Sequence, residues 1–292
     1  MKVGLCCVGR LENKYAREFV EYYLSLGVDN IILYDDNDVN EDDFREVIGD
    51  YIQSGKVIWC RFSKQHGFIQ KQIYYHCWET QKYNFDWIAF FDFDEFLTLT
   101  SHSDIKSYLS DTIFTPYDMI HINWMGYDDN NLIYYEDKPL LERFTHPHEF
   151  DLPKQYTFPE NNHIKSIIRC EHKGYVNWSM GSNMHTPSNN LKCCDNKGKE
   201  CSNSNPFLHY NFDLAYLKHF STKTIDEWLN VKLQRGFLDQ CLNKDKEYDA
   251  LGLDIFFKIN QKTEEKINFI KEFHDKTEKK YKNIENFLKN TI

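Results

Sequence analysis

The sequence lacks several features that would place it in common classes of protein. It contains no run of about 18 apolar residues, so we expect no membrane-spanning helix. Its first residues lack the long apolar segment and the cleavage site of a secretory signal peptide. Acidic residues outnumber basic ones by 45 to 35, which argues against a basic surface for nucleic acid. These absences predict a cytosolic protein without a nucleic-acid partner, and they leave open peripheral contact with the inner face of a membrane.

Motifs of several enzyme classes are missing as well. No Gly-rich dinucleotide-binding loop follows the first apolar run, and no phosphate-binding loop of the nucleotide-hydrolase type occurs. There is no Gly-x-Ser-x-Gly elbow either. Nicotinamide chemistry, that kind of ATP hydrolysis and acyl transfer from a serine are therefore disfavoured.

Cysteine is present in nine copies, an odd number without regular spacing. Three of them fall in apolar runs, where a free thiol behaves as a small apolar side chain: Cys6, Cys60 and Cys170. Another group lies in a polar stretch and consists of Cys193, Cys194, Cys201 and His209. The spacing of this group matches no standard pair of zinc ligands, so free thiols are expected, with a zinc site as the alternative.

The first hundred residues do contain a regular alternation of apolar runs and amphipathic segments. The runs of strand length are residues 2–8, 30–34, 57–62 and 86–91, and the segments with helical spacing are residues 15–26, 41–54 and 69–83. Right-handed crossovers between such strands predict an α/β fold with a mostly parallel central sheet covered by helices. Ligands of these sheets bind beyond the carboxyl ends of the strands. The acidic residues after the second and fourth strands are therefore expected at one edge of the sheet.

The rest of the chain is less regular. Short strand-like runs occur at residues 119–124, 164–169 and 174–178, and the polar stretch 188–206 is typical of an exposed loop. From residue 221 the pattern is helical, with a long Lys- and Glu-rich amphipathic segment over residues 263–288. We therefore expect a first domain over residues 1–215 and a helical C-terminal extension over residues 216–292.

The acidic motif at the end of the fourth strand carries the strongest chemical signal. Asp92, Asp94 and Glu95 interrupt an otherwise apolar run over residues 87–97. In extended geometry Asp92 and Asp94 point to one face, about 6.6 Å apart along the chain. Two carboxylates so placed repel one another and lose hydration, and a divalent cation removes this cost. Mg²⁺ or Mn²⁺ takes one or two carboxylates and completes its shell with phosphate oxygens and water, so the motif predicts a site for a metal and a phosphorylated ligand.

This motif, WIAFFDFDEFL at residues 87–97, resembles the signature of glycosyltransferase family 92 and of related bacterial family-2-like enzymes. Further blocks agree with that family in order along the chain: residues 18–36, Gln70 with Tyr74 and Cys77, residues 165–167, residues 183–185, and residues 219–224 with Lys232, Arg235 and Gly236. The resemblance extends over residues 2–236. The chain departs from the family at residues 10–13, which read Arg-Leu-Glu-Asn where the family commonly has Arg-Asn-Glu, and at residues 35–38, which read Asp-Asp-Asn-Asp where it has Asp-Asn-x-Ser.

The resemblance implies that residues 1–215 are a catalytic domain of the GT-A type, which binds a nucleotide sugar. It implies that Asp92 and Asp94 hold Mn²⁺ or Mg²⁺, with His185 as the candidate for a further ligand. An ordinary loop histidine bonded to backbone is the alternative for His185. The candidates for contact with the nucleotide sugar, carried over from the matching blocks, are Arg10, Asp35, Asp36, Gln70, Asp92, Lys165, Lys223 and Arg235. Lys223, Lys165 and Arg235 are the candidates for contact with the diphosphate, and an ordinary surface charge is the alternative for each of them.

Transfer with inversion needs a carboxylate base near the acceptor hydroxyl. The loop of residues 124–129 resembles the aromatic, glycine and acidic loop that contacts the acceptor in some galactosyltransferases. Asp128 is therefore the first candidate for the base and Glu95 the second. Trp124 and Tyr127 are candidates to stack on the acceptor sugar, with a place in the core as the equal alternative for Trp124.

The function expected from the resemblance is transfer of a hexose, with galactose as the first candidate, from a UDP-sugar to a glycan or glycolipid acceptor in surface-glycan synthesis. A sugar nucleotidyltransferase is one alternative, although it would carry more glycines and cations than residues 7–10 offer. A non-catalytic sugar-binding or scaffold protein is the other.

Overall fold

The computed structural model describes residues 1–38, 41–62, 69–147, 159–178, 185–202, 205–233, 253–278 and 281–290. The chain forms two units, one made of Met1–Gly126 and Phe150–His219, the other of Tyr127–Glu149 and Phe220–Ile292. The first unit contains the sheet, and the second contains the C-terminal helices. The domain boundary predicted after residue 215 stays a prediction.

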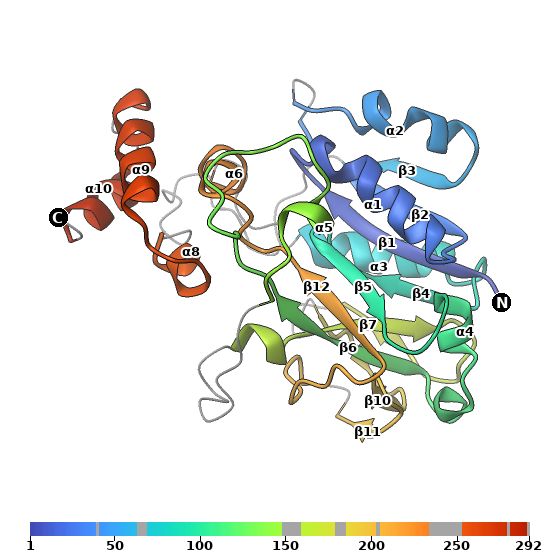
Figure 1. The fold of residues 1–292 in the computed structure, drawn as a ribbon. Helices are drawn as coiled ribbons and strands as arrows, with labels where there is room; N and C mark the ends of the chain where they lie inside the picture. The colour runs from blue at the N-terminus through green and yellow to red at the C-terminus, as the bar shows by residue number, and fades with distance from the viewer. Residues whose placement is uncertain are drawn as a thin grey trace. The chain divides into compact units, whose positions relative to one another are not determined.

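Strands and helices alternate through the N-terminal part of the first unit, as predicted (Figure 1). The elements are β1 (Val3–Gly9), α1 (Asn13–Ser25), β2 (Asn30–Asp35), α2 (Phe44–Gln53), β3 (Val57–Arg61), α3 (Ile69–Gln81) and β4 (Trp87–Phe90). Helix α1 shows why the periodicity was informative, because it buries Tyr15, Phe19 and Tyr23 on one face. The chain leaves α1 through Gly27, whose φ of 96° favours glycine. The predicted α/β fold is confirmed.

The order of the N-terminal strands places a ligand site at one edge of the sheet. Strands β4, β1, β2 and β3 are neighbours in that order, and all three pairs are parallel. The direction of the crossovers reverses at β1, because β2 pairs with one of its edges and β4 with the other. Open α/β sheets bind ligands at such a reversal, beyond the carboxyl ends of the strands. Those ends are here Gly9, Asp35 and Phe90.

Beyond β4 the sheet is mixed. The further strands are β5 (Glu95–Leu99), β6 (Met119–Gly126), β7 (Ile164–Arg169), β10 (Cys193–Asp195), β11 (Glu200–Cys201) and β12 (Ala215–His219). Strand β7 lies antiparallel between β4 and β6, and β12 pairs antiparallel with β5 and parallel with β6. The mostly parallel arrangement thus holds for β1 to β4, because β5 follows β4 through a tight turn and not through a crossover helix.

The smaller elements of the first unit are α4 (Ile105–Leu109), two 3₁₀ turns (Thr112–Phe114 and Pro159–Asn162) and the short pair β8 (Val176–Asn177) and β9 (Ser188–Asn189). The polar stretch 188–206 is not simply the exposed loop that its composition predicted. It contains β10 and β11, and β10 pairs with β6 and buries Cys193 and Cys194. Strands of two or three residues are too short to show a period of two, so composition gave no signal for them.

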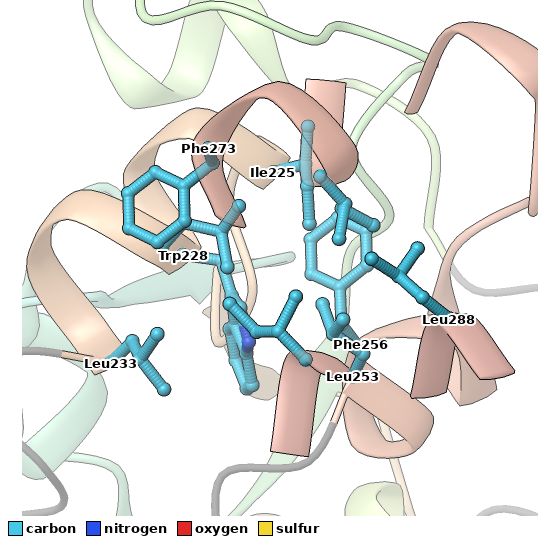
Figure 2. Packing of buried hydrophobic residues seen from close by; sticks show 10 residues of the cluster. Ile225, Trp228, Leu233, Leu253, Phe256, Phe273 and Leu288 are labelled. Carbon is cyan, nitrogen blue, oxygen red and sulfur yellow. The ribbon is translucent and has the colours of Figure 1, made fainter. Parts of the chain in front are cut away.

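The second unit is built on helices around an apolar core (Figure 2). Its helices are α5 (Leu140–Arg143), α6 (Ile225–Glu227), the π-helical turn η4 (Trp228–Lys232), α8 (Leu253–Ile259), α9 (Glu264–Lys276) and α10 (Lys282–Lys289). Trp228 and Phe256 meet at the centre of this core with ring centroids 5.6 Å apart. The long amphipathic segment predicted over residues 263–288 is two helices, since α9 ends where Glu278 adopts a left-handed φ of 52°. Among the helices described, none has both the length and the apolar character needed to cross a membrane.

Candidate active site

The acidic motif forms a turn between β4 and β5, and not the extended strand end that we predicted. The backbone N–H of Glu95 donates to the carbonyl of Asp92 at 3.1 Å, which closes the turn. Between them Phe93 is buried against Gly9 at the end of β1, where an added Cβ would lie 2.7 Å from its ring. This packing reverses the chain, so Asp92 and Asp94 meet different partners.

Asp92 is held by three donors from two other elements. Gln70 Nε2 donates to Asp92 Oδ1 at 2.7 Å, and the Tyr74 hydroxyl donates to the same oxygen at 3.0 Å. Lys165 Nζ, from β7, lies 2.7 Å from Asp92 Oδ2. Two sequence-predicted residues, Gln70 and Lys165, therefore meet Asp92, while Tyr74 was noticed only as part of a matching block. These bonds fix the orientation of the Asp92 carboxylate.

Glu95 lies next to Asp92 and Lys165 and is fully buried, with an exposed fraction of 0%. Its Oε2 accepts the backbone N–H of Asp92 at 2.9 Å, and its Oε1 lies 3.5 Å from Lys165 Nζ. Burial raises the pKa of Glu95 to about 8, against the opposing effect of Lys165. Burial lowers the pKa of Lys165, but Asp92 and Glu95 outweigh it and raise the pKa above its usual value. Lys165 is therefore a fixed cation, and the enclosed position of Glu95 suits a residue that orients the turn.

Asp94 faces a histidine that the sequence had not singled out as a ligand. His219 ends β12, where it pairs in register with Glu95 of β5 and with Gly126 of β6. Its Nε2 lies 3.8 Å from Asp94 Oδ1, and both residues are buried. His219 opens one of the blocks that match the family, which was the signal available in the sequence. The strand pairing that brings it to the acidic turn joins residues more than a hundred positions apart.

His185, the predicted third metal ligand, lies against the indole of Trp124 with ring centroids 5.0 Å apart. Its backbone carbonyl accepts a hydrogen bond from Ser166 Oγ at 2.8 Å. Burial, followed by the charge of Lys165, lowers the pKa of His185 well below its usual value. The Trp124 ring also contacts His219, at 4.0 Å between centroids. Both candidate histidines thus contact one indole.

The acidic turn offers few protein ligands to a divalent cation. Across the described ranges, no three side chains among His, Cys, Asp and Glu are grouped so that they could hold a metal together. In an octahedral Mg²⁺ shell with bonds of about 2.0–2.1 Å, adjacent ligand atoms lie about 3 Å apart and opposite ones about 4.2 Å apart. Asp94 Oδ1 and His219 Nε2, at 3.8 Å, lie between these two separations. Such an ion takes most of its remaining ligands from phosphate and water.

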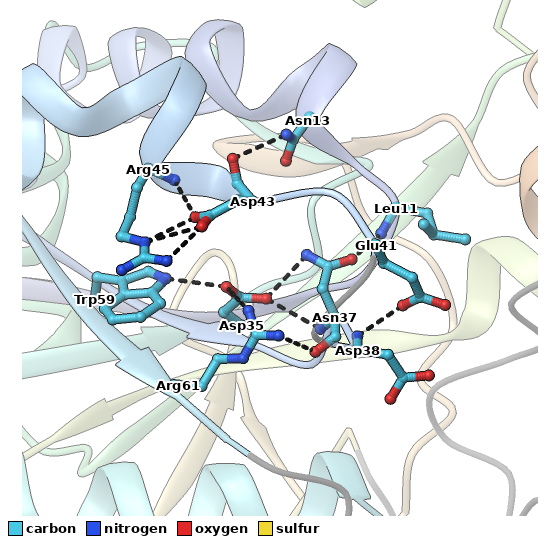
Figure 3. A network of polar contacts seen from close by, with 10 residues as sticks. All are labelled: Leu11, Asn13, Asp35, Asn37, Asp38, Glu41, Asp43, Arg45, Trp59 and Arg61. Atoms are coloured by element: carbon cyan, nitrogen blue, oxygen red, sulfur yellow. Dashed lines mark hydrogen bonds and ion pairs between the residues drawn. The ribbon is translucent and has the colours of Figure 1, made fainter.

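The acidic end of β2 forms a second polar network (Figure 3). The Asp35 carboxylate is buried and accepts hydrogen bonds from Arg61 at 2.8 Å, from Trp59 and from Asn37. Asp36 is buried next to it. Arg10, which follows β1, is paired with Asp38 at 3.0 Å and with Glu41 at 2.5 Å. The contacts of Asp35 and Arg10 thus order the loop beyond the sheet edge.

The remaining predicted residues belong to the second unit or lie outside the described residues. Asp128 has a side chain that is 34% exposed, and its Oδ1 accepts the backbone N–H of Asn130 at 2.8 Å. Lys223 is buried, and its φ of 55° is a left-handed conformation that costs a residue with a side chain about 1–2 kcal/mol. Backbone strain of this kind gathers at functional sites. Arg235 lies outside the described residues.

With this geometry in view, comparison with known families decides the assignment. The model of glycosyltransferase family 92 matches residues 5–291. The chain belongs to glycosyltransferase family 92. The match confirms the resemblance and the predicted enzyme class, a glycosyltransferase. The comparison with curated proteins found no match.

Solved structures of TarS from S. aureus are similar to this family 92 chain at a low level. The crystal structure of TarS gives a TM-score of 0.42 at 13% identity over 92% of this chain and 47% of TarS. TarS 1-349 in complex with UDP gives 0.40 at 13% identity over 92% and 78%. TarS 1-349 in complex with UDP-GlcNAc gives 0.37 at 13% identity over 58% and 46%. The chain thus spans about half of the TarS chain in the first and third comparisons. At these TM-scores the assignment rests on the family match alone.

Proposed function

We propose that this glycosyltransferase moves a hexose, with galactose as the first candidate, from a UDP-sugar to a glycan or glycolipid acceptor. The transfer inverts the anomeric carbon, depends on Mn²⁺ or Mg²⁺ and serves the synthesis of a surface glycan. It takes place in the cytosol or at the inner face of the membrane. The acidic turn at the carboxyl edge of the sheet and the family of the chain support this proposal.

The single observation that carries the proposal is the approach of Asp94 Oδ1 to His219 Nε2 at 3.8 Å. This distance is too long for a hydrogen bond and suits two ligands of one divalent ion. Asp94 and His219 would hold that ion, and His185, the candidate from the sequence, contacts the same Trp124 ring as His219. When bound, the ion supplies positive charge to the diphosphate that leaves the sugar.

Asp92 and Lys165 belong to the same site, and their hydrogen bonds hold them in place. The carboxylate of Asp92 is fixed by Gln70, Tyr74 and Lys165, so it can orient the donor with little loss of conformational entropy. Lys165 keeps the acidic turn from repelling an anionic diphosphate in a protein whose net charge is -10. Lys223, with its strained backbone, is proposed as a further cation for the diphosphate.

The acceptor half of the reaction is assigned to Asp128. It is a partly exposed carboxylate, as a base that takes a proton from an acceptor hydroxyl must be. Glu95, the second candidate, is enclosed and bonded to the turn, which supports a positioning role for it.

The test is release of UDP from a panel of UDP-hexoses, measured with Mn²⁺ and with a chelator in place of it, followed by NMR of the sugar product. We expect one UDP-hexose to be preferred, with UDP-galactose as the first candidate, and a product of inverted anomeric configuration. A panel on which no donor is cleaved or bound would contradict the proposal. Retained configuration at the anomeric carbon would contradict its inverting part.

A further inference from the structure

Two neighbouring tyrosines of α1 bond to the backbone of β5 next to the acidic turn. The Tyr23 hydroxyl donates to the carbonyl of Glu95 at 2.7 Å and accepts the N–H of Leu97 at 3.0 Å. The Tyr22 hydroxyl donates to the carbonyl of Leu97 at 2.6 Å. The N–H of Glu95 donates to the carbonyl of Asp92 within the turn. All four backbone polar groups of Glu95 and Leu97 thus have a partner outside the pairing of β5 with β12.

The Tyr23 hydroxyl has a fixed position. The side chain is fully buried, and its ring packs against Phe19 and Phe91 with centroids 4.8 and 6.0 Å apart. A phenol can donate one hydrogen bond and accept another at the same time, so this hydroxyl bridges Glu95 and Leu97. Among the described strands β12 is the partner of β5, and the bonds of Tyr22 and Tyr23 take the place of a second strand.

Glu95 links this edge of β5 to both proposed metal ligands. It follows Asp94 directly in the chain, and its register partner in β12 is His219. A shift of the Glu95 backbone would therefore displace Asp94 with respect to His219, whose Nε2 lies 3.8 Å from Asp94 Oδ1. A metal site has to be held to within about 0.5 Å, because Mg²⁺ demands near-ideal octahedral geometry. The bonds that fix Glu95 thus fix the ligands offered to an ion.

We infer that Tyr23 is a positioning residue for the metal site, because its hydroxyl fixes the start of β5 and so keeps Asp94 facing His219. This inference rests on the proposed function, in which Asp94 and His219 hold the ion. Tyr23 touches neither the ion nor the substrate in this scheme. A phenylalanine at this position would fill the same space, but it would leave the buried Glu95 carbonyl and Leu97 N–H without the phenolic oxygen between them.

The experiment measures the dissociation constant of Mn²⁺ for the full chain with UDP present. Electron paramagnetic resonance detects the free Mn²⁺, and binding to UDP alone is subtracted. We expect Tyr23→Phe to raise the constant about tenfold, since loss of a group that orients a metal ligand costs about 10- to 100-fold in metal affinity. Tyr108→Phe is the matched control, because Tyr108 is fully buried and its hydroxyl donates to the carbonyl of Asn196 at 2.9 Å, between β10 and β11. This control also loses a buried hydrogen bond, but it should bind Mn²⁺ as the wild type does.

Chemical denaturation of both variants separates loss of metal binding from loss of fold. If Tyr23→Phe does not fold, Tyr22→Phe takes its place, and it should weaken Mn²⁺ binding more than Tyr108→Phe does.

Three results would overturn the inference: the wild type binds no Mn²⁺, the constant is unchanged in the folded α1 variant, or it rises equally in Tyr108→Phe. Failure of the proposed function looks different, because UDP-hexose would then not be hydrolysed while Mn²⁺ binding still depended on the tyrosine hydroxyl.

Discussion

Lys165 is enclosed between two carboxylates, with its Nζ 2.7 Å from Asp92 Oδ2 and 3.5 Å from Glu95 Oε1. Its own side chain is 1% exposed. Removal of one partner from a buried ion pair leaves a charge without compensation, which costs more than the pair itself contributes. The balance of charge in the acidic turn therefore depends on this one ammonium group.

We expect Lys165→Met to lower the free energy of unfolding by about 1–3 kcal/mol, because the partly buried Asp92 carboxylate then loses the cation that it contacts. Donor hydrolysis should fall with it, since Asp92 loses its fixed orientation. Chemical denaturation and UDP release measure the two effects. Lys192→Met is the control, because Lys192 is half-exposed and its 3.8 Å pair with Glu200 lies at the surface. Equal stability of the two variants would refute this account of Lys165.

A second prediction concerns the base. Asp128→Asn should lower the rate of transfer to an acceptor about 100-fold or more, because the acceptor hydroxyl loses its proton acceptor. The Michaelis constant for the donor and the melting temperature should stay near the wild-type values, since the side chain is partly exposed. Glu95→Gln is the comparison. If only Glu95→Gln lost transfer of the sugar to the acceptor, then Glu95 and not Asp128 would be the base.

Part of this site could be predicted from the sequence. Asp92, Gln70 and Lys165 come from three separate segments that matched the family, and the fold brings them together. The Asp35 carboxylate, by contrast, accepts hydrogen bonds from Arg61 and from neighbouring residues. These contacts could not be predicted from the linear sequence. His219 was overlooked as a ligand because its meeting with Asp94 depends on the register of β12 with β5.

At the scale of elements, the end of β1 and the acidic turn are packed face to face. Gly9 leaves room for the rings of Phe44 and Phe93, which stack with centroids 5.4 Å apart and an interplanar angle of 9°. Both rings are buried, so neither can yield to a larger residue. The position of Asp92 and Asp94 is thus set by the contact between β1 and the turn.

Gly9→Ala should lower the free energy of unfolding by about 1–3 kcal/mol, because its Cβ would lie 2.7 Å from ring atoms of Phe44 and Phe93. Donor hydrolysis should fall more than stability alone explains, since Phe93 sits between the two aspartates. Gly49→Ala is the control within α2, where an added Cβ has open space. We expect Gly49→Ala to be neutral or stabilising by about 1 kcal/mol at most. The reverse ranking in denaturant melts would contradict the packing argument.

The alternation of elements up to β4 was predictable because each element is long enough to show its period and is linked to the next by a short connection. The mixed part of the sheet could not be predicted from the sequence in this way. Strands β10 and β11 are two or three residues long, and β12 reaches β5 and β6 from far along the chain. Pairings of this kind are decided by tertiary packing, which leaves little trace in local composition.

On the scale of the whole molecule, the second unit joins two distant parts of the chain. Arg143 of α5 and Glu227 of α6 form two parallel hydrogen bonds of 2.8 and 2.9 Å, with side chains 1% and 2% exposed. Asp129 and Lys266 form a second buried pair at 2.5 Å. These pairs tie residues 127–149, which carry Asp128, to the C-terminal helices. The helical extension thus supports the segment that we assign to the acceptor.

A double-mutant cycle tests the first of these pairs. Arg143→Met and Glu227→Leu alone should each lower the free energy of unfolding by about 3–5 kcal/mol, because each leaves a buried charge behind. The double variant should lose less than the sum of the two, since no charge then remains unpaired. Equilibrium denaturation gives all four values. Additive losses would show that the two side chains do not act as a pair.

The central claim is that Asp94 holds a metal ion that the donor reaction requires. The most direct measurement is the rate of UDP release from UDP-hexose at increasing Mn²⁺, for the wild type, Asp94→Asn and the surface control Asp213→Asn, whose side chain is 64% exposed. We predict that a chelator abolishes release, that Mn²⁺ restores it in the wild type and in Asp213→Asn, and that no Mn²⁺ concentration restores it in Asp94→Asn. Release that persists in the chelator, or that Asp94→Asn retains, would contradict the account.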